Sequence, residues 1–159
     1  MLIRKATTDD VSLLTDIIRN SFRDVATRFH LTPENCPTHH SNCIDEWTST
    51  ALIKGLIFYI LENEDLPCGC VALEFKDLEK CYLKRLAVLP EYRRRGFGEA
   101  LVKRVLEEAS KQKTRRVEIG VIAGHQELVE WYGKLGFSTK ETVHFDHLPF
   151  DVAVMSIQL

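Results

Sequence analysis

The segment Arg93-Arg94-Arg95-Gly96-Phe97-Gly98 decides the interpretation of this chain. It lies between an apolar run typical of a strand and a segment with the apolar periodicity of a helix. Its two glycines have no Cβ, so backbone N–H groups can approach an anion closely. A helix that begins near Phe97 adds orphan N–H groups and a positive dipole end, and the three arginines add guanidinium donors. The segment therefore predicts a pyrophosphate site; a solvated turn before a tight helix start is the alternative.

Other phosphate-binding motifs do not fit the sequence. A P-loop is excluded because no Gly-x4-Gly-Lys-Ser/Thr pattern occurs, and a dinucleotide fingerprint would have glycine where Leu101 stands.

Two stretches together carry a family resemblance. The stretch from Leu83 to Leu101 resembles the signature of the GCN5-related N-acetyltransferase (GNAT) family, Arg/Gln-x-x-Gly-x-Gly/Ala, in which Arg93, Gly96 and Gly98 take the defined positions. Downstream, the stretch WYGKLGF at 131–137 resembles the family's Leu-Tyr-x-x-x-Gly-Phe segment. The two signatures stand at the family's separation, with one helix and one strand between them. The resemblance covers nearly the whole chain.

Length and composition predict one globular domain, an N-acetyltransferase domain over residues 1–159. The chain is 45% hydrophobic and 28% charged, which is typical of such domains. No apolar run approaches the roughly 18 residues that a membrane helix needs, and the first residues lack the apolar segment of a signal peptide. The odd count of 5 cysteines then predicts reduced thiols. We expect a cytoplasmic protein that does not bind membranes.

Charge is distributed unevenly along the chain. Residues 76–116 carry 13 Lys and Arg against 6 Asp and Glu, although the whole chain has a net charge of −2. A basic segment around the predicted pyrophosphate site, with acidic flanks, suits an anionic cofactor and a cationic amine substrate. Scattered solvated charge is the alternative for the acidic part. Nucleic-acid binding is not expected, because the total charge is negative and the cofactor already accounts for the basic residues.

Apolar periodicity and turn residues predict seven strands and four helices. The strands are expected at 2–6, 56–61, 68–75, 81–88, 116–121, 137–145 and 150–157. The helices are expected from Thr7 or Thr8 to Phe22, from a Ser41 cap to Gly55, over 97–111 and over 127–135. This order resembles the GNAT fold, an α/β (α+β) architecture. Its mixed, mostly antiparallel sheet of about seven strands is splayed between strands 4 and 5 and has about four flanking helices.

The resemblance implies that acetyl-CoA is the co-substrate. It assigns the N–H of Leu86 to the acetyl oxygen and that of Val88 to the pantetheine arm. His125 stands where many family members have an asparagine, and a histidine can still donate one hydrogen bond; an exposed histidine at a helix start is the alternative. The cofactor-binding residues that the resemblance implies are Leu86, Ala87, Val88, Arg93, Arg94, Arg95, Gly96, Phe97, Gly98, Glu99 and His125.

The resemblance also implies that Tyr132 is the general acid that protonates the departing thiolate. The alternative is a core tyrosine on one helical stripe with Leu128 and Leu135. Many family members carry a glutamate at the positions of Tyr82 or Gly120, and neither residue is acidic here. Glu118 lies two residues before Gly120, on the same strand face, and is the nearest titratable substitute for the base. A solvated carboxylate with a water chain as base remains the alternative.

The segment Cys36-x2-His39-His40-x2-Cys43 invites a zinc interpretation, because thiol and imidazole ligands are closely spaced. A second, distant ligand pair is lacking, so we expect no metal. The resemblance instead makes this loop, with residues 143–149, a wall of the acceptor pocket.

The expected activity is direct transfer of acetyl from acetyl-CoA to the primary amine of a small molecule or peptide, by a monomer or homodimer. The alternatives are a non-catalytic acyl-CoA sensor and a dimerisation domain without a cofactor.

Overall fold

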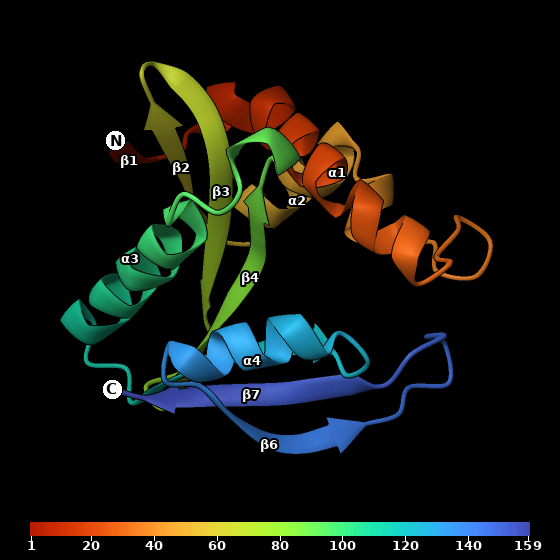
Figure 1. The fold of residues 1–159 in the computed structure, drawn as a ribbon. Coiled ribbons are helices and arrows are strands. Elements are labelled where there is room, and N and C mark those ends of the chain that lie inside the picture. The colour runs from red at the N-terminus through yellow and green to blue at the C-terminus, as the bar shows by residue number, and fades with distance from the viewer. The chain divides into compact units, whose positions relative to one another are not determined.

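The computed structural model describes residues 1–159, and its elements follow the predicted order (Figure 1). The strands are β1 (Leu2–Lys5), β2 (Ile57–Asn63), β3 (Leu66–Phe75), β4 (Lys80–Val88), β5 (Arg116–Ile122), β6 (Ser138–Val143) and β7 (Val152–Gln158). The helices are α1 (Val11–Arg28), α2 (Asp45–Ile53), α3 (Phe97–Lys111) and α4 (Gln126–Lys134). Three short 3₁₀ segments are η1 (Thr8–Asp10), η2 (His40–Asn42) and η3 (Pro90–Tyr92). None of the helices combines the length and the apolar character needed to cross a membrane.

The seven strands form one sheet in the order β1-β2-β3-β4-β5-β7-β6. The sheet is mostly antiparallel, and β4 and β5 run parallel. Their ladder has three pairs and ends at Tyr82–Glu118, so β4 from Leu83 onward lies beyond it. The predicted mixed sheet with four helices is confirmed.

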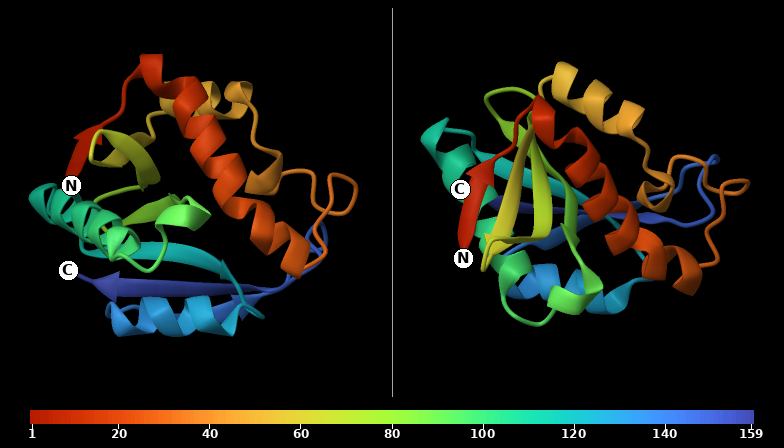
Figure 2. Two further views of the ribbon diagram at one scale, coloured as in Figure 1. Left: turned by 45° about the horizontal axis from the view of Figure 1, so that its top comes forward. Right: turned by 90° about the horizontal axis from the view of Figure 1, so that it is seen from above.

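Tertiary contacts divide the chain into two compact units. Unit 1 comprises Met1–Glu74 and Leu83–Val105, and unit 2 comprises Phe75–Tyr82 and Leu106–Leu159. In unit 1, α1 and α2 lie on the same side of the strands (Figure 2). The apolar residues of α1 recur at a spacing of three and four, so they share one face and meet residues of β2, β3 and β4 in a buried core. That core includes Leu14, Ile17, Ile18, Phe58, Ile60, Cys70, Ala72 and Ala87.

In unit 2, α4 lies along β7 (Figures 1 and 2). The helix ends in a Schellman motif, in which the N–H of Phe137 donates to Tyr132 O and that of Gly136 to Gly133 O. Gly136 has a φ of +105°, which a residue with a side chain rarely adopts. Gly136 therefore closes the helix that was predicted over residues 127–135.

Two helix boundaries differ from the prediction by more than two residues. The N-terminal helix starts as predicted, with Thr7 as its cap in a capping box with Asp10, but α1 continues to Arg28 rather than ending at Phe22. The predicted start of the second helix at Ser41 is wrong. The His39 side chain accepts the Ser41 N–H and caps the short η2, so α2 begins only at Asp45.

All five cysteines are free and buried: Cys36, Cys43, Cys68, Cys70 and Cys81. Burial disfavours the thiolate and raises every thiol pKa, to about 12 for Cys70 and about 11 for Cys81.

A close approach of β3 and β4 requires glycine at position 69. A Cβ at Gly69 would lie 2.5 Å from Ala87 O and 3.3 Å from Leu101 Cδ1. The first contact is with backbone, which cannot move aside as a flexible side chain would.

We expect Gly69→Ala to lower the free energy of unfolding by roughly 1–3 kcal/mol, because the added methyl group overpacks this contact. Urea unfolding monitored by circular dichroism measures the change. Gly133→Ala is the matched control: a Cβ there meets no atom within 4 Å, and alanine in α4 should stabilise by about 0.5–1 kcal/mol. Equal effects of the two substitutions would contradict the steric explanation.

An arginine joins β1 to the start of the first helix. The Arg4 guanidinium donates to Asp10 at 2.8 and 2.9 Å and to Glu62 at 2.9 Å. These hydrogen bonds outweigh the effect of burial and lower the pKa of Asp10 from 3.8 to about 2.

We expect Asp10→Asn to cost about 2 kcal/mol of stability at pH 7, because the folded state favours the ionised carboxylate. Since the folded pKa lies below the unfolded one, this contribution is present above about pH 4 and is lost as pH falls toward 2. Stability curves of both proteins should therefore converge in acid. Asp9→Asn, at the exposed neighbour, serves as control, and a pH-independent difference for Asp10→Asn would refute the linkage.

Candidate functional site

The loop between η3 and α3 has the backbone conformation of an anion-binding turn. Arg94 has a φ of +62° and Gly96 a φ of +80°, and α3 begins directly afterwards at Phe97. Left-handed residues next to a helix start let backbone N–H groups converge on one point. The surface at Gly96 is open, because a Cβ built there would meet no atom within 4 Å. Residues 94–98 therefore fit a pyrophosphate approaching the backbone.

The side chain of Arg93 is engaged within unit 1. Its Nη1 donates to Asp24 at 2.5 Å, its Nη2 donates to Ser21 O at 2.7 Å, and its Nε donates to Val88 O at 3.1 Å. Burial acts to raise the pKa of Asp24, but the hydrogen bond and charge of Arg93 outweigh it and hold that pKa below its ordinary value. Arg93 thus joins the loop to α1 and to the end of β4.

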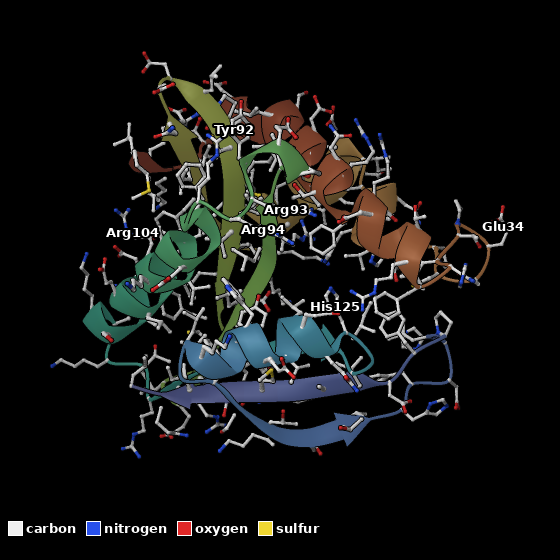
Figure 3. All side chains as sticks on the ribbon, viewed as in Figure 1. Glu34, Tyr92, Arg93, Arg94, Arg104 and His125 are labelled. Atoms are coloured by element: carbon white, nitrogen blue, oxygen red, sulfur yellow. The ribbon has the colours of Figure 1, made fainter.

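The two following arginines are exposed (Arg94 is labelled in Figure 3). The Arg95 guanidinium lies 5.6 Å from the centre of the Tyr92 ring, a cation–π distance. Phe97 is buried and anchors the first turn of α3, whereas Glu99 is exposed and pairs with Lys103 at 3.0 Å. Arg94 and Arg95 are therefore the guanidinium groups of this segment that face solvent.

The end of β4 carries the predicted contacts to the thioester. Leu86 and Val88 are half-buried, and Ala87 between them is buried in the core with α1 and α2. Arg85 has a φ of +53°, which interrupts the regular strand just before them. This segment lies beyond the three-pair ladder with β5.

Tyr132 is buried in unit 2, with 5% of its surface exposed. Its ring meets those of Trp131 and Phe137 edge-on, at centroid distances of 4.9 and 5.5 Å. Burial raises the pKa of its phenol well above the ordinary value, so the hydroxyl keeps its proton at neutral pH. A protonated phenol in an apolar setting suits the predicted general acid.

His125 lies at the start of α4 (Figure 3), where its Nδ1 accepts the Leu128 N–H at 3.3 Å. When the ring is neutral and accepts at Nδ1, its proton is on Nε2. Nδ1 also lies 3.4 Å from Glu127 Oε2, a pair that is charged only when the ring is protonated. The third predicted site residue of unit 2 is Glu118. Its carboxylate accepts from Arg116 Nε at 2.9 Å and lies 3.7 Å from Lys80 Nζ. Its register partner on β4 is Tyr82.

The His39–His40 segment packs on an aromatic ring. Phe22 lies 5.8 Å from the His39 ring and 5.0 Å from the His40 ring. Burial, with a smaller effect of Arg85, lowers the pKa of His40 to about 3, so the ring is neutral. No group of three or more His, Cys, Asp and Glu side chains is arranged to hold a metal ion.

Comparison with known proteins decides the family. The sequence matches the Acetyltransferase (GNAT) family over residues 18–137. The chain belongs to that family. An uncharacterized N-acetyltransferase of Methanocaldococcus jannaschii is 34% identical to this GNAT protein over 92 residues, which span 54% of the chain and 41% of the relative. The chain thus spans less than half the length of that curated relative.

Solved structures share the fold of this GNAT protein. The ribosomal-protein-S18-alanine N-acetyltransferase of Escherichia coli has a TM-score of 0.78 at 17% identity, covering 99% of this chain and 92% of that one. An N-acetyltransferase of Thermoplasma acidophilum, solved in complex with coenzyme A, has a TM-score of 0.75 at 16% identity, with full coverage of both chains. The resemblance stated from the two sequence signatures is confirmed.

We expect Asp24→Asn to make the loop of residues 93–98 more mobile in this GNAT protein, because the substitution removes the negative charge that holds the Arg93 side chain. Amide hydrogen exchange of residues 93–98, measured by mass spectrometry, should become faster, while global stability falls by at most about 1 kcal/mol, as is usual for a half-exposed ion pair.

Asp16→Asn is the matched control for this substitution, because Asp16 pairs with Arg19 at 2.6 Å within α1 itself. Unchanged exchange in the loop of Asp24→Asn would show that the pair does not fix the loop.

Proposed function

We propose that this GNAT protein transfers the acetyl group of acetyl-CoA to a primary amine by direct attack of the amine on the thioester, within one domain over residues 1–159. The observation that carries the proposal is the open, left-handed turn at Gly96 before α3, within the signature that the family shares. The coenzyme A complex of the Thermoplasma relative supports acetyl-CoA as the donor.

The chain would hold the pyrophosphate through backbone N–H groups at Gly96 and Gly98 and through the exposed guanidinium groups of Arg94 and Arg95. Backbone N–H groups of Leu86 and Val88 would bind the acetyl oxygen and the pantetheine arm. Arg93 would act indirectly, by holding the loop in place through Asp24. His125 would offer its Nε2 proton as a further donor.

Tyr132 would protonate the thiolate sulfur as the thioester C–S bond breaks, since its buried phenol stays protonated. The amine must lose a proton to form the amide, and Glu118 is the proposed base or the group that orients a relay water. The ribosomal-protein-S18-alanine N-acetyltransferase of Escherichia coli, which shares the fold, supports a peptide or other primary amine as the acceptor.

We expect Tyr132→Phe to lower kcat by roughly 10²–10⁴-fold while leaving the affinity for acetyl-CoA unchanged, because only the proton donor is lost. Steady-state kinetics and calorimetry measure the two quantities, and the melting temperature should change little since the ring remains.

Tyr59→Phe is the control, because Tyr59 is also buried, with 6% exposure, and lies in β2. A lower melting temperature with normal turnover for Tyr132→Phe would make Tyr132 a core residue instead. If the wild type binds acetyl-CoA but acetylates no amine of a broad panel, the protein is an acyl-CoA sensor rather than an enzyme.

A further inference from the structure

Unit 1 contains a cavity of about 440 Å³ beneath α2. Its wall combines residues of α2 and of the turn between α2 and β2 with the end of β3 and the middle of β4. Five of the nine residues of the wall are charged, and three of those five are cations. The lining residues are Glu46, Trp47, Thr50, Ala51, Lys54, Leu56, Glu74, Lys84 and Arg85.

The Arg85 guanidinium carries a buried donor that is not satisfied within the chain. Its Nη1 is buried and has no hydrogen-bond partner, and its Cζ lies 5.7 Å from the centre of the Phe58 ring. A buried cation is stable only when it is paired or hydrogen-bonded, so an unsatisfied guanidinium donor is unusual. Burial lowers the pKa of Arg85, although an arginine side chain remains charged at any physiological pH.

The charge of Glu74 acts on Arg85, but no acidic group nearby accepts a hydrogen bond from its buried Nη1. Glu74 already accepts from Lys84 Nζ at 2.9 Å. The buried thiols of Cys43 and Cys70 have raised pKa values and are therefore neutral. The wall of the cavity thus carries three cations and two carboxylates. Arg85 itself also has a left-handed backbone conformation within β4.

The position of Arg85 in the chain connects the cavity to the proposed reaction. It directly precedes Leu86, whose N–H is proposed to bind the acetyl oxygen. The residue that would hold a ligand anion is therefore the direct neighbour in sequence of the segment that would present the acetyl group. The carboxylate of Glu46 in the same wall suits an ammonium group on the same ligand.

We propose that Arg85 binds a carboxylate of the acceptor in this cavity, so that the acceptor is a primary amine that also carries a carboxylate group. The proposal rests on the acetyltransferase function proposed above. The carboxylate has two possible sources, the α-carboxylate of a free amino acid and an acidic side chain near the amino terminus of a peptide.

The first experiment compares acceptors that differ only in the carboxylate. One arm uses free amino acids and their α-amides, and the other uses short peptides with Glu or Gln at the second position. We expect the wild type to prefer the carboxylate member of one arm by about 10- to 100-fold in kcat/KM, the usual range for one charge-assisted hydrogen-bonded contact. The arm that shows the preference identifies the source.

Substitutions at Arg85 test whether this side chain causes the preference for the carboxylate acceptor. Arg85→Gln should abolish the preference, mainly through KM, with kcat/KM for the amide member changed little, and Arg85→Lys should restore part of it. Lys54→Gln is the matched control, since it removes an exposed cation from the same wall and should change the preference by less than about threefold. No preference in the wild type, or an equal loss for both members in Arg85→Gln, would overturn the proposal.

A binding measurement separates this proposal from the acetyltransferase function. N-Acetylglycine and N-acetylglycinamide are titrated against the wild type and Arg85→Gln, with the arginine Nε resonances followed by NMR. Selective, Arg85-dependent binding of N-acetylglycine without turnover of any amine would support the anion site and contradict the proposed acetyltransferase function. Turnover of amines with no discrimination between the two probes and no carboxylate preference in either acceptor arm would support the transferase and reject the role of Arg85.

Discussion

The hydrogen bonds of the Arg93 side chain are the constraint on which the candidate site depends. A loop with left-handed residues at Arg94 and Gly96 is a costly conformation, which must be held by its surroundings. Arg93 holds it by donating to α1 through Asp24 and Ser21 and to β4 through Val88. One side chain therefore fixes the loop, the end of the strand and the helix relative to one another within unit 1.

Three partly buried arginines of unit 1 differ in the groups that balance their positive charge. Arg4 is matched by two carboxylates, from Asp10 and Glu62, and Arg93 by the carboxylate of Asp24. Arg85 instead lies against the face of the Phe58 ring and has a buried donor without a hydrogen-bond partner. The carboxylate partners of Arg4 and Arg93 give these two arginines structural roles. Arg85 keeps a donor that an anion of a ligand could bind.

Local patterns in the sequence predicted most elements, because each has clear ends. The range of α3 was predicted without error, since glycines and a long apolar period mark it. The predicted start of α2 was wrong because the His39 side chain caps a short 3₁₀ turn at the place where Ser41 was expected to cap a helix. The partner of Arg93 was missed because Asp24 lies 69 residues away, and no local signal joins the two. The unsatisfied state of Arg85 is likewise a property of packing, which a sequence pattern does not contain.

The burial of every cysteine has a practical consequence for chemical labelling. Reagents such as maleimides react with accessible thiolates, and each native thiol here is both covered and disfavoured from ionising. A single cysteine introduced on the surface would therefore be the fastest-reacting thiol in the folded protein, with all five native cysteines left in place. Fluorophores or spin labels can thus be attached to the wild-type background, and the order of reaction of the native thiols would itself report which part of the fold opens first.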